Sequence, residues 1–385
     1  MKNFQHLTAE DRSRLFFLEP EEVTKKSHAF MLGAALGASL YIPAIRDDIA
    51  GDVIKRAKTG SSSVIICLED SVPDERLEEA EEKLVKALAV LAEADESQLP
   101  LIFVRPRDPD HLMRIERIIR PYLNVLTGFS LPKFTKDNAE AFLELISKYS
   151  FSSRTHLYAM PILESPSIIY GETRQEELRS IYEICQNYSR HVLNIRIGAT
   201  DMASPYSLRR SRDLNIYDVK VIASAIGDIV NVFGRADDGY TISGPVWEHF
   251  TDRERLFQPR LRRSPFASHE ASELRSALIL QDLDGLIREV ELDRANGLWG
   301  KTVIHPTHVA LVNSMMVVSH EEYSDALDIA GGSSSGAVAS SYRNKMNEVK
   351  PHTAWANRTL IRARVFGVAN ENISFVDLME ANFNI

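Results

Sequence analysis

The stretch Leu157-Tyr158-Ala159-Met160-Pro161-Ile162-Leu163-Glu164 is an apolar run that ends in a carboxylate. A second stretch, Leu193-Asn194-Ile195-Arg196-Ile197-Gly198-Ala199-Thr200-Asp201, also ends in one, and a helical pattern lies between the two. Carboxylates at the C-terminal ends of successive parallel strands meet at one edge of a sheet, where they suit a hard divalent cation. We therefore predict a metal site at Glu164 and Asp201. Taken singly, either residue could instead be a helix cap or a surface acid.

Eight runs of strand length occur along the chain, and most are continuously apolar rather than alternating. Such runs are typical of parallel strands that are buried on both faces. We predict strands at Ser39–Ala44, Ser63–Leu68, Leu101–Arg105, Gly128–Lys133, Leu157–Glu164, Asn194–Ala199, Tyr240–Val246 and Thr302–His305.

Amphipathic helical patterns separate these strands, most clearly at Asp74–Ala94, Asn138–Tyr149, Gln175–Tyr188 and Tyr217–Phe233. Eight strand–helix units within about 270 residues predict an α/β fold of the (β/α)8 TIM-barrel type. A doubly wound open sheet is the alternative. The chain has no G-x-G-x-x-G after the first strand, which disfavours the dinucleotide-binding form of that sheet.

Two segments lie outside this repeat. We expect residues 1–38 to be an N-terminal helical extension and residues 39–330 to be the catalytic barrel, ending in a helix near Glu321–Ala330. Residues 331–385 would form a C-terminal segment with a helix at Ala354–Val368 and a short acidic tail. The glycine-serine run at 331–336 is expected to be a flexible loop, because the Lys-Ser/Thr that would follow in a phosphate-binding loop is missing.

The composition is that of a soluble globular protein, with 44% hydrophobic and 26% charged residues. The net charge of -9 argues against a general attraction to nucleic acid or anionic membrane. Two cysteines, Cys67 and Cys185, cannot form a disulfide framework. Because there is neither a signal-peptide core nor an uncharged apolar run of 18 residues, we expect a cytoplasmic protein.

Titratable side chains follow apolar residues directly at most of the predicted strand ends. Besides the metal pair, these are Glu69, Asp70, Arg105, Lys133 and His305. Two carboxylates plus waters hold Mg²⁺ and leave positions free for a bidentate oxygen substrate such as a 2-oxo acid. Such a metal stabilises an enolate while a carbon–carbon bond forms or breaks, and an arginine opposite it can stabilise the developing oxyanion.

Each of these residues also has a structural interpretation. Arg105 could form an ion pair with Glu69 or Asp70, and one of those two acids could cap the following helix. Lys133 could be an ordinary surface lysine. His305 could be a general base or a buried histidine that shapes the strand end, and the residues alone favour the second.

These strand ends, in this order, resemble the citrate lyase beta-subunit-like branch of the HpcH/HpaI aldolase superfamily. The resemblance covers about residues 39 to 370. The matching segments are Ser39-Leu40-Tyr41-Ile42-Pro43, Leu68-Glu69-Asp70-Ser71-Val72, Val104-Arg105, Leu131-Pro132-Lys133, Leu163-Glu164-Ser165-Pro166, Gly198-Ala199-Thr200-Asp201-Met202 and Gly300-Lys301-Thr302-Val303-Ile304-His305-Pro306-Thr307-His308.

The resemblance implies a Mg²⁺- or Mn²⁺-dependent carbon–carbon lyase on a TIM barrel, usually a homo-oligomer. Glu164 and Asp201 match the metal ligands of the family, and Arg105 matches the arginine that contacts the substrate. Glu69 and Asp70 match the acidic pair that holds metal-bound waters or substrate, so the three catalytic candidates are Arg105, Glu69 and Asp70.

The chain departs from the family pattern in its basic residues. Arg107 stands where relatives commonly have asparagine, Ala44 stands where they have glycine, and a basic cluster at Arg209–Arg212 follows the sixth strand. Arg107 and the cluster at Arg209–Arg212 favour a small substrate with a further anionic group, such as a phosphate or a polycarboxylate. The substrate-binding candidates are thus Arg107, Lys133, Arg209 and Arg210.

The same basic residues have structural alternatives. The cluster after the sixth strand could be a solvated loop. Asp377 and Glu380 of the acidic tail could balance the arginines in an oligomer, and the 253–263 region could form a lid or an oligomer contact.

Three functions are compatible with these residues. The leading one is a Mg²⁺-dependent lyase or aldolase that acts on a carbonyl-containing acid through a metal-stabilised enolate. The second is a metal-dependent hydrolase or isomerase of an acyl-CoA or phosphorylated acid. The third is a non-catalytic ligand-binding or scaffold barrel. Retention of both metal carboxylates and Arg105 favours an enzyme.

Overall fold

Eight parallel strands surround the centre of the molecule in the order β8-β7-β6-β5-β4-β3-β2-β9. The computed structural model describes residues 1–250, 283–331, 337–340, 342, 344 and 346–383. The strands are β2 (Ala38–Pro43), β3 (Ser63–Cys67), β4 (Leu101–Arg105), β5 (Gly128–Leu131), β6 (Tyr158–Leu163), β7 (Asn194–Ile197), β8 (Thr241–Ser243) and β9 (Lys301–Val303). All eight predicted strands are therefore present, most of them one or two residues shorter than predicted.

The two ends of this sheet meet and nearly close a barrel. β2 pairs with β9, and a parallel bridge joins Gly244, just after β8, to Lys301 of β9. The Gly244 N–H donates to the Gly300 carbonyl at 2.8 Å, and the Thr302 N–H donates to the Gly244 carbonyl at 3.0 Å. The predicted (β/α)8 barrel is confirmed, and the open doubly wound sheet is excluded.

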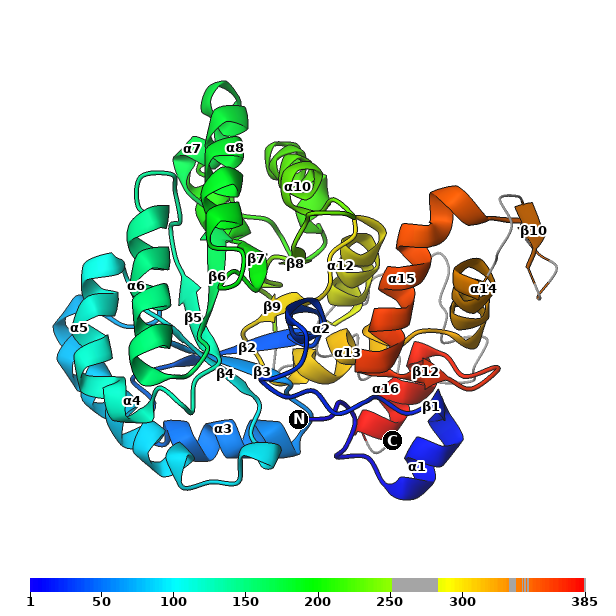
Figure 1. Cartoon of the computed structure of the whole chain (residues 1–385), viewed down its shortest axis with the longest axis horizontal. Coiled ribbons are helices and arrows are strands. Elements are labelled where there is room, and N and C mark those ends of the chain that lie inside the picture. The colour runs from blue at the N-terminus through cyan, green and yellow to red at the C-terminus, as the bar shows by residue number, and fades with distance from the viewer. Residues whose placement is uncertain (251–282, 332–336, 341, 343, 345, 384–385) are drawn as a thin grey trace.

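Helices cover the outside of the strands (Figure 1). They are α3 (Ile49–Lys58), α4 (Leu77–Ala92), α5 (Pro109–Ile119), α6 (Ala139–Ser153), α7 (Pro166–Ile169), α8 (Gly171–Asn187), α9 (Ala199–Ala203), α10 (Lys220–Phe233), α12 (Asp284–Ala295) and α13 (Thr307–Met316). The amphipathic patterns predicted α4, α6, α8 and α10, because each of these four helices buries its apolar face. In α4, for example, Leu84, Leu88 and Leu91 are buried while most of its acids are not.

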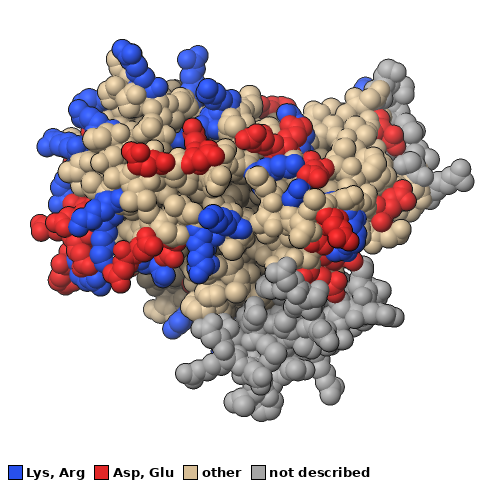
Figure 2. All heavy atoms as spheres, turned by 90° about the horizontal axis from the view of Figure 1, so that it is seen from below, with Lys and Arg blue, Asp and Glu red and all other residues tan. Residues whose placement is uncertain are grey.

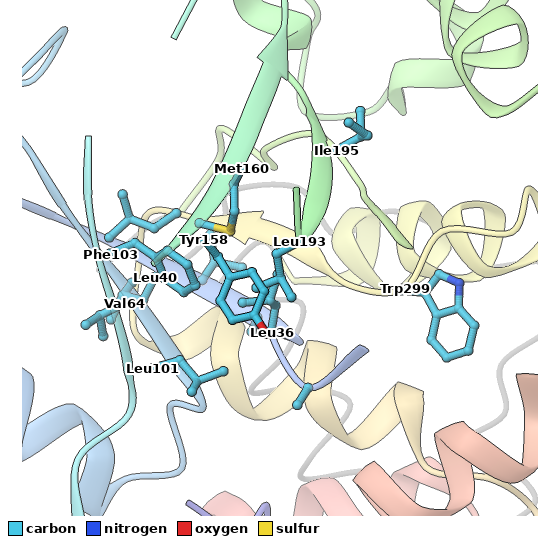
Figure 3. Packing of buried hydrophobic residues seen from close by; sticks show 14 of the residues in the cluster. Leu36, Leu40, Val64, Leu101, Phe103, Tyr158, Met160, Leu193, Ile195 and Trp299 are labelled. Atoms are coloured by element: carbon cyan, nitrogen blue, oxygen red, sulfur yellow. The ribbon is translucent and has the colours of Figure 1, made fainter. Parts of the chain in front are cut away.

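The strands are buried on both faces, as their continuous apolar sequences indicate. Figure 3 shows part of this core, with Leu101, Phe103, Tyr158 and Met160 among the labelled side chains. Phe103 and Met160 are fully buried, and Tyr158 is 7% exposed. Packing of this kind makes the barrel a filled scaffold whose strand ends have fixed positions.

A buried ion network lies beneath the junction of β8 and β9. The Lys301 ammonium lies 2.8 Å from Glu289 and 2.7 Å from Asp293, both on α12, and all three side chains are fully or almost fully buried. The Tyr217 hydroxyl donates to Asp293 at 2.8 Å. These ion pairs connect α12 to β9. They reinforce the closure of the barrel between β8 and β9, where, among the described residues, the backbone forms only a single bridge outside the strands.

The N-terminal 38 residues contain α1 (Ala9–Leu15), β1 (Phe16–Leu18) and α2 (Ala29–Ala34). α2 packs against the N-terminal ends of β7 and β8. A Cβ at Gly33 would lie 2.9 Å from the Leu193 carbonyl oxygen and 2.5 Å from Thr241 Oγ1, so only glycine allows this close approach. The segment thus covers the end of the barrel opposite the predicted site.

The C-terminal segment differs in detail from the prediction. α14 (His320–Gly331) is present, but α15 spans Val349–Phe366 and ends before Val368. Gly367, with φ +84, ends the helix, and the next residues form β12 (Val368–Ala369), antiparallel to β1. Two further strands, β10 (Ala337–Ala339) and β11 (Met346–Glu348), form a separate hairpin pair.

The predicted acidic tail is folded over most of residues 370–383. They include α16 (Phe375–Phe383), whose Val376, Leu378 and Met379 are buried. The carboxylate of Asp377 accepts the Ser374 N–H at 2.8 Å at the start of this helix. The segment folds because it carries enough apolar surface to bury, and Asp377 lies in the first turn of the helix, where a carboxylate is favourable.

Two sequence predictions lie outside the described residues. They are most of the glycine-serine run, at 332–336, and the proposed lid or oligomer contact at 253–263. In the part of the chain that is described, no helix is both long and apolar enough to cross a bilayer. Figure 2 shows basic and acidic side chains interspersed on the lower face rather than segregated by sign.

Candidate active site at the C-terminal end of the barrel

Strand register brings the first three candidates together. Cys67 of β3 lies opposite Arg105 of β4, and partners in parallel strands share a face of the sheet. Glu69 and Asp70 follow shortly after β3, and the side chains of both reach Arg105, Glu69 from a buried position and Asp70 from an exposed one. The side chain of Glu69 is accordingly 6% exposed, and that of Asp70 is 54% exposed.

Arg105 is the centre of an ion cluster at this end of the barrel. Its Nη2 lies 2.9 Å from Glu69 Oε2 and 3.3 Å from Glu164 Oε1, and its Nη1 lies 3.3 Å from Asp70 Oδ2. Three acids from the ends of two strands thus hold one buried guanidinium. Arg105 therefore has the ion pairs that the sequence offered as its structural alternative. Contact with substrate stays a prediction.

Lys133 joins the same cluster through an unusual backbone conformation. Its φ of 47° lies in the left-handed region, which is uncommon for a residue other than glycine. In this conformation its backbone N–H donates to Glu164 Oε1 at 2.8 Å, and its side-chain Nζ donates to Glu69 Oε1 at 2.6 Å. Strain of this kind persists where surrounding contacts enforce it, often at functional sites.

Glu164 is buried and lies directly against the end of β7. A Cβ at Gly198 would lie 2.0 Å from Glu164 Oε2, so glycine is needed there to make room for the carboxylate. Burial raises the pKa of Glu164 to about 7; the charge of Arg105 opposes this rise, and the negative charge of Asp201 adds to it. The carboxylate is thus short of positive charge even with Arg105 beside it.

The carboxylates that were predicted to bind metal keep free oxygens. Within the described ranges, Glu164 Oε2 and both oxygens of Asp201 accept no hydrogen bond. No group of three or more His, Cys, Asp or Glu side chains in those ranges is arranged to hold a metal ion. Two carboxylates with open lone pairs, in mutual repulsion, fit a magnesium-type ion that keeps several waters, and do not fit a closed all-protein cage.

Arg107 forms hydrogen bonds and an ion pair with the loop that follows β3. Its Nε donates to the Leu68 carbonyl at 3.0 Å, its Nη2 donates to the Val72 carbonyl at 2.7 Å, and its Nη1 pairs with Asp74. The guanidinium is therefore held by groups of this chain. Its predicted role in binding a second substrate anion stays a prediction.

The two arginines after β7 have different surroundings. Arg210 is buried, pairs with Glu289 and, at 3.5 Å, with Glu248, and its guanidinium carbon lies 5.0 Å from the Trp247 ring. Arg209, Thr200 and Glu248 help to line a cavity of about 490 Å³, and Arg209 has no ion-pair partner among the residues described. Of the pair, Arg209 is the one available to a ligand.

Two arginines of the predicted basic mouth, Arg107 and Arg210, are thus balanced by carboxylates of this chain. Asp74 pairs with Arg107, and Glu248 and Glu289 pair with Arg210. The sequence offered Asp377 and Glu380 as that balance. In this structure Asp377 instead bonds to Ser374 at the start of its own helix.

Sequence reasoning missed Arg196, which lies inside the barrel beneath the cluster. Its Nη1 donates to Ser39 Oγ at 3.2 Å and its Nη2 to Thr302 Oγ1 at 2.5 Å. The Tyr41 ring centroid lies 5.8 Å from the Arg196 guanidinium carbon and 5.9 Å from that of Arg105. A charged residue in the middle of a buried strand is rare without a partner, and that signal could have identified it.

The two histidines of the last motif also differ. His305 Nδ1 lies 2.8 Å from Thr307 Oγ1, and its ring stacks on Phe250 with centroids 4.7 Å apart. His308 is fully buried. Burial lowers its pKa to about 3, and the nearby charges of His305 and Lys301 act in the same direction.

We expect His308 to make the protein less stable in acid. Because its pKa is depressed in the folded state, its contribution is present above pH 6.5 and is lost as the pH falls. Between pH 6.5 and 5 it should reduce the free energy of unfolding by about 2 kcal/mol. Urea unfolding at several pH values should show that loss in the native protein and a flatter profile in His308→Phe. Parallel profiles for the two proteins would contradict the expectation.

A family model described as C-C bond lyase of the TIM-barrel fold matches residues 30–368. Among solved structures, Mycobacterium tuberculosis CitE in complex with magnesium, acetoacetate and coenzyme A is 19% identical, with a TM-score of 0.54 over 86% of this chain and 99% of that chain. Haloferax volcanii malate synthase in its magnesium/glyoxylate complex is 13% identical, with a TM-score of 0.49 over 71% of this chain and 72% of that one.

An HpcH/HpaI aldolase from Desulfitobacterium hafniense is 10% identical, with a TM-score of 0.39 over 70% of this chain and 85% of that one. None of the curated proteins matches this sequence. At 19% identity, the similarity to the CitE structure supports the fold but not a particular substrate or reaction. The family model spans the barrel from α2 to the start of β12, and the chain therefore belongs to the C-C bond lyases of the TIM-barrel fold, the superfamily that its strand ends resemble.

Proposed function

We propose that the protein is a Mg²⁺-dependent lyase that cleaves or forms a carbon–carbon bond next to the carbonyl of a small anionic acid. The observation that carries this proposal is the juxtaposition of open carboxylate oxygens on Glu164 and Asp201 with the buried guanidinium of Arg105. Membership of the C-C bond lyase family supports the reaction class. The free, buried Cys67 and Cys185 support a cytoplasmic enzyme.

Glu164 and Asp201 would hold the cation, Mg²⁺ or Mn²⁺, with waters completing its coordination. When bound, such an ion acts as a Lewis acid that lowers the energy of an enolate beside a carbonyl. Gly198 allows Glu164 its position, and the Lys133 N–H fixes one of the two Glu164 oxygens. The other oxygen remains available.

Arg105 binds the substrate carboxylate or the developing oxyanion. Glu69 and Asp70 hold the guanidinium in place, so little reorganisation is needed when substrate arrives. Burial works against the charge of Lys133, but its hydrogen bond to Glu69 and the charges of Glu69 and Asp70 outweigh it, so its pKa is raised. Lys133 is therefore protonated at neutral pH and suited to bind an anion rather than to act as a base.

A second anionic group of the substrate would bind at Arg209. Arg209 and Thr200 line the same cavity of about 490 Å³, and Thr200 directly precedes Asp201. That adjacency places a free guanidinium within reach of an extended substrate. The similar CitE from M. tuberculosis was solved in complex with coenzyme A, so a thioester is one form that such a substrate could take, and a phosphorylated acid is another.

Deuterium exchange tests the proposed reaction without knowledge of the full substrate. The protein is incubated in D₂O with Mg²⁺ and a panel of 2-oxo acids and acyl thioesters, and NMR follows exchange next to the carbonyl together with cleavage products. We expect exchange with at least one compound, and its loss when EDTA removes the metal. Thioester hydrolysis without exchange would favour the hydrolase alternative. Tight Mg²⁺ binding with neither exchange nor cleavage in any compound would contradict the proposal.

A further inference from the structure

A second cavity, of about 600 Å³, lies at the opposite end of the barrel from the carboxylates. One wall of this cavity belongs to the barrel and is formed by residues that precede β8, including Gly234, and β9, including Trp299. The candidate active site, in contrast, is formed by residues that follow the strands. The other wall of the cavity is α15, next to α12 at the side of the barrel (Figure 1). We call this the arginine cavity, after Arg294 of α12 and Arg358 and Arg362 of α15.

Positive charge is in excess in the arginine cavity. Glu322 of α14 lies 3.5 Å from Arg294 and 3.0 Å from Arg362, and no other carboxylate in the described part of the chain pairs with these arginines. The Arg358 Nη2 donates to the Gly234 carbonyl at 2.7 Å and to the Arg235 carbonyl at 3.0 Å. Three guanidiniums and two carboxylates, Glu291 and Glu322, thus line the cavity, and only Glu322 lies within ion-pair distance of an arginine there.

The surroundings of Arg294 also indicate an excess of positive charge in the cavity. Burial lowers its pKa, and the like charge of Arg362 lowers it further, against the opposing charges of Glu322 and Glu291. The Nε atoms of Arg294 and Arg362 are buried, and neither has a hydrogen-bond partner among the described residues. Buried donors without acceptors are uncommon in folded proteins, and the oxygens of an anion in the cavity could accept from these two.

The rest of the wall is apolar and partly aromatic. Trp299, Leu298, Met316 and Ala354 line the cavity, together with Trp355, whose side chain is 38% exposed. An exposed indole next to guanidiniums that carry an excess of positive charge is the combination that binds a planar or apolar group carrying an anionic end. The volume of the cavity lies within the range usual for small-molecule sites.

We propose that the arginine cavity binds a small organic anion, with phosphate or carboxylate oxygens on Arg294, Arg358 and Arg362 and an apolar or planar body against Trp355. This site is separate from the candidate active site and does not depend on the proposed lyase reaction. Because the walls of the cavity come from the barrel and from α15, a bound anion would stabilise the packing of α15 against the barrel.

Calorimetric titration at low salt tests the proposal with three probes: inorganic phosphate, phenyl phosphate and benzoate. We expect at least one of the two aromatic anions to bind more tightly than inorganic phosphate, and the better of the two identifies the preferred oxygen group. Arg358→Gln and Arg362→Gln should each weaken that binding by about tenfold, the loss expected for a charge-assisted contact. Bound probe should also raise the Tm of the native protein.

Two controls separate this site from others. Arg179→Gln, which changes an exposed arginine of α8, should leave the affinity unchanged, and so should Glu164→Gln at the active site. Arg362 pairs with Glu322, so its variant must retain a cooperative thermal transition, and Arg358→Gln provides an independent reading if it does not. The proposal is overturned if no probe binds, or if folded Arg358→Gln binds the probes as the native protein does.

Discussion

Glu164→Gln and Asp201→Asn will each weaken Mg²⁺ binding by on the order of a hundredfold, because the number of charged oxygen ligands sets the affinity of such sites. Both substitutions keep the shape of the side chain. In Glu164→Gln the introduced amide oxygen can still accept the Lys133 N–H that Glu164 accepts at 2.8 Å. The effect of removing the negative charge on metal binding can then be measured without unfolding the protein. Calorimetric titration with Mg²⁺ and with Mn²⁺ measures the effect directly.

The matched control is Glu177→Gln. Glu177 of α8 is also buried and also accepts a backbone N–H, that of Lys136 at 2.9 Å, but it lies on the outside of the barrel. Its variant should bind Mg²⁺ as the native protein does. If Glu164→Gln and Asp201→Asn both keep full metal affinity, the two carboxylates are not the metal ligands, and the proposed function loses its main support.

Arg105→Lys will lower deuterium exchange by about a hundredfold or more, the usual effect of removing one oxyanion-binding donor. A lysine keeps the positive charge but cannot contact Glu69, Asp70 and Glu164 together, as the guanidinium does. Arg105→Gln should also lower the free energy of unfolding, by about 3–5 kcal/mol, because it leaves Glu69 and Glu164 buried without the counter-charge of the guanidinium.

Two readouts distinguish a substrate contact from a purely structural ion pair. If Arg105 only stabilises the fold, the Arg105→Lys variant will have a lower Tm, but its folded form will keep the exchange rate of the native protein. If Arg105 contacts substrate, exchange will fall far more than Tm. Arg120→Gln is the control, because the Arg120 side chain is 63% exposed and pairs with the buried Glu116 outside the site. Loss of the Arg120 guanidinium leaves the buried Glu116 without this partner, so it should lower the Tm, but it should leave exchange unchanged.

The barrel was predictable because its signal is local. Each strand is a short apolar run that must be buried on both faces, and each helix repeats its apolar residues with the helical period. Errors occur where a distant partner decides the outcome. The three-residue strand β1 pairs with β12, which lies near the other end of the chain, so no pattern near Phe16 indicates it. α15 ends at Phe366 because Gly367 adopts a positive φ and the chain then joins β1.

The candidate site was predictable to the level of strand ends and no further. Parallel strands bring their C-terminal ends to one side, so Glu69, Arg105 and Glu164 could be expected to gather there. The partners of Arg107 and Arg210 could not be expected. Those arginines pair with Asp74 and with Glu289, and such pairs depend on how loops and outer helices approach the strand ends.

The strand–helix repeat, the superfamily, and the strands that end in carboxylates or arginine could all be read from the sequence, because burial and periodicity act over a few residues. The three-dimensional structure was needed to see which basic side chains have carboxylate partners, that Arg196 lies inside the barrel, and that Arg294 of α12 and Arg362 of α15 share Glu322. Electrostatic pairing depends on distances of a few ångströms between segments far apart in the chain, and no local pattern carries those distances.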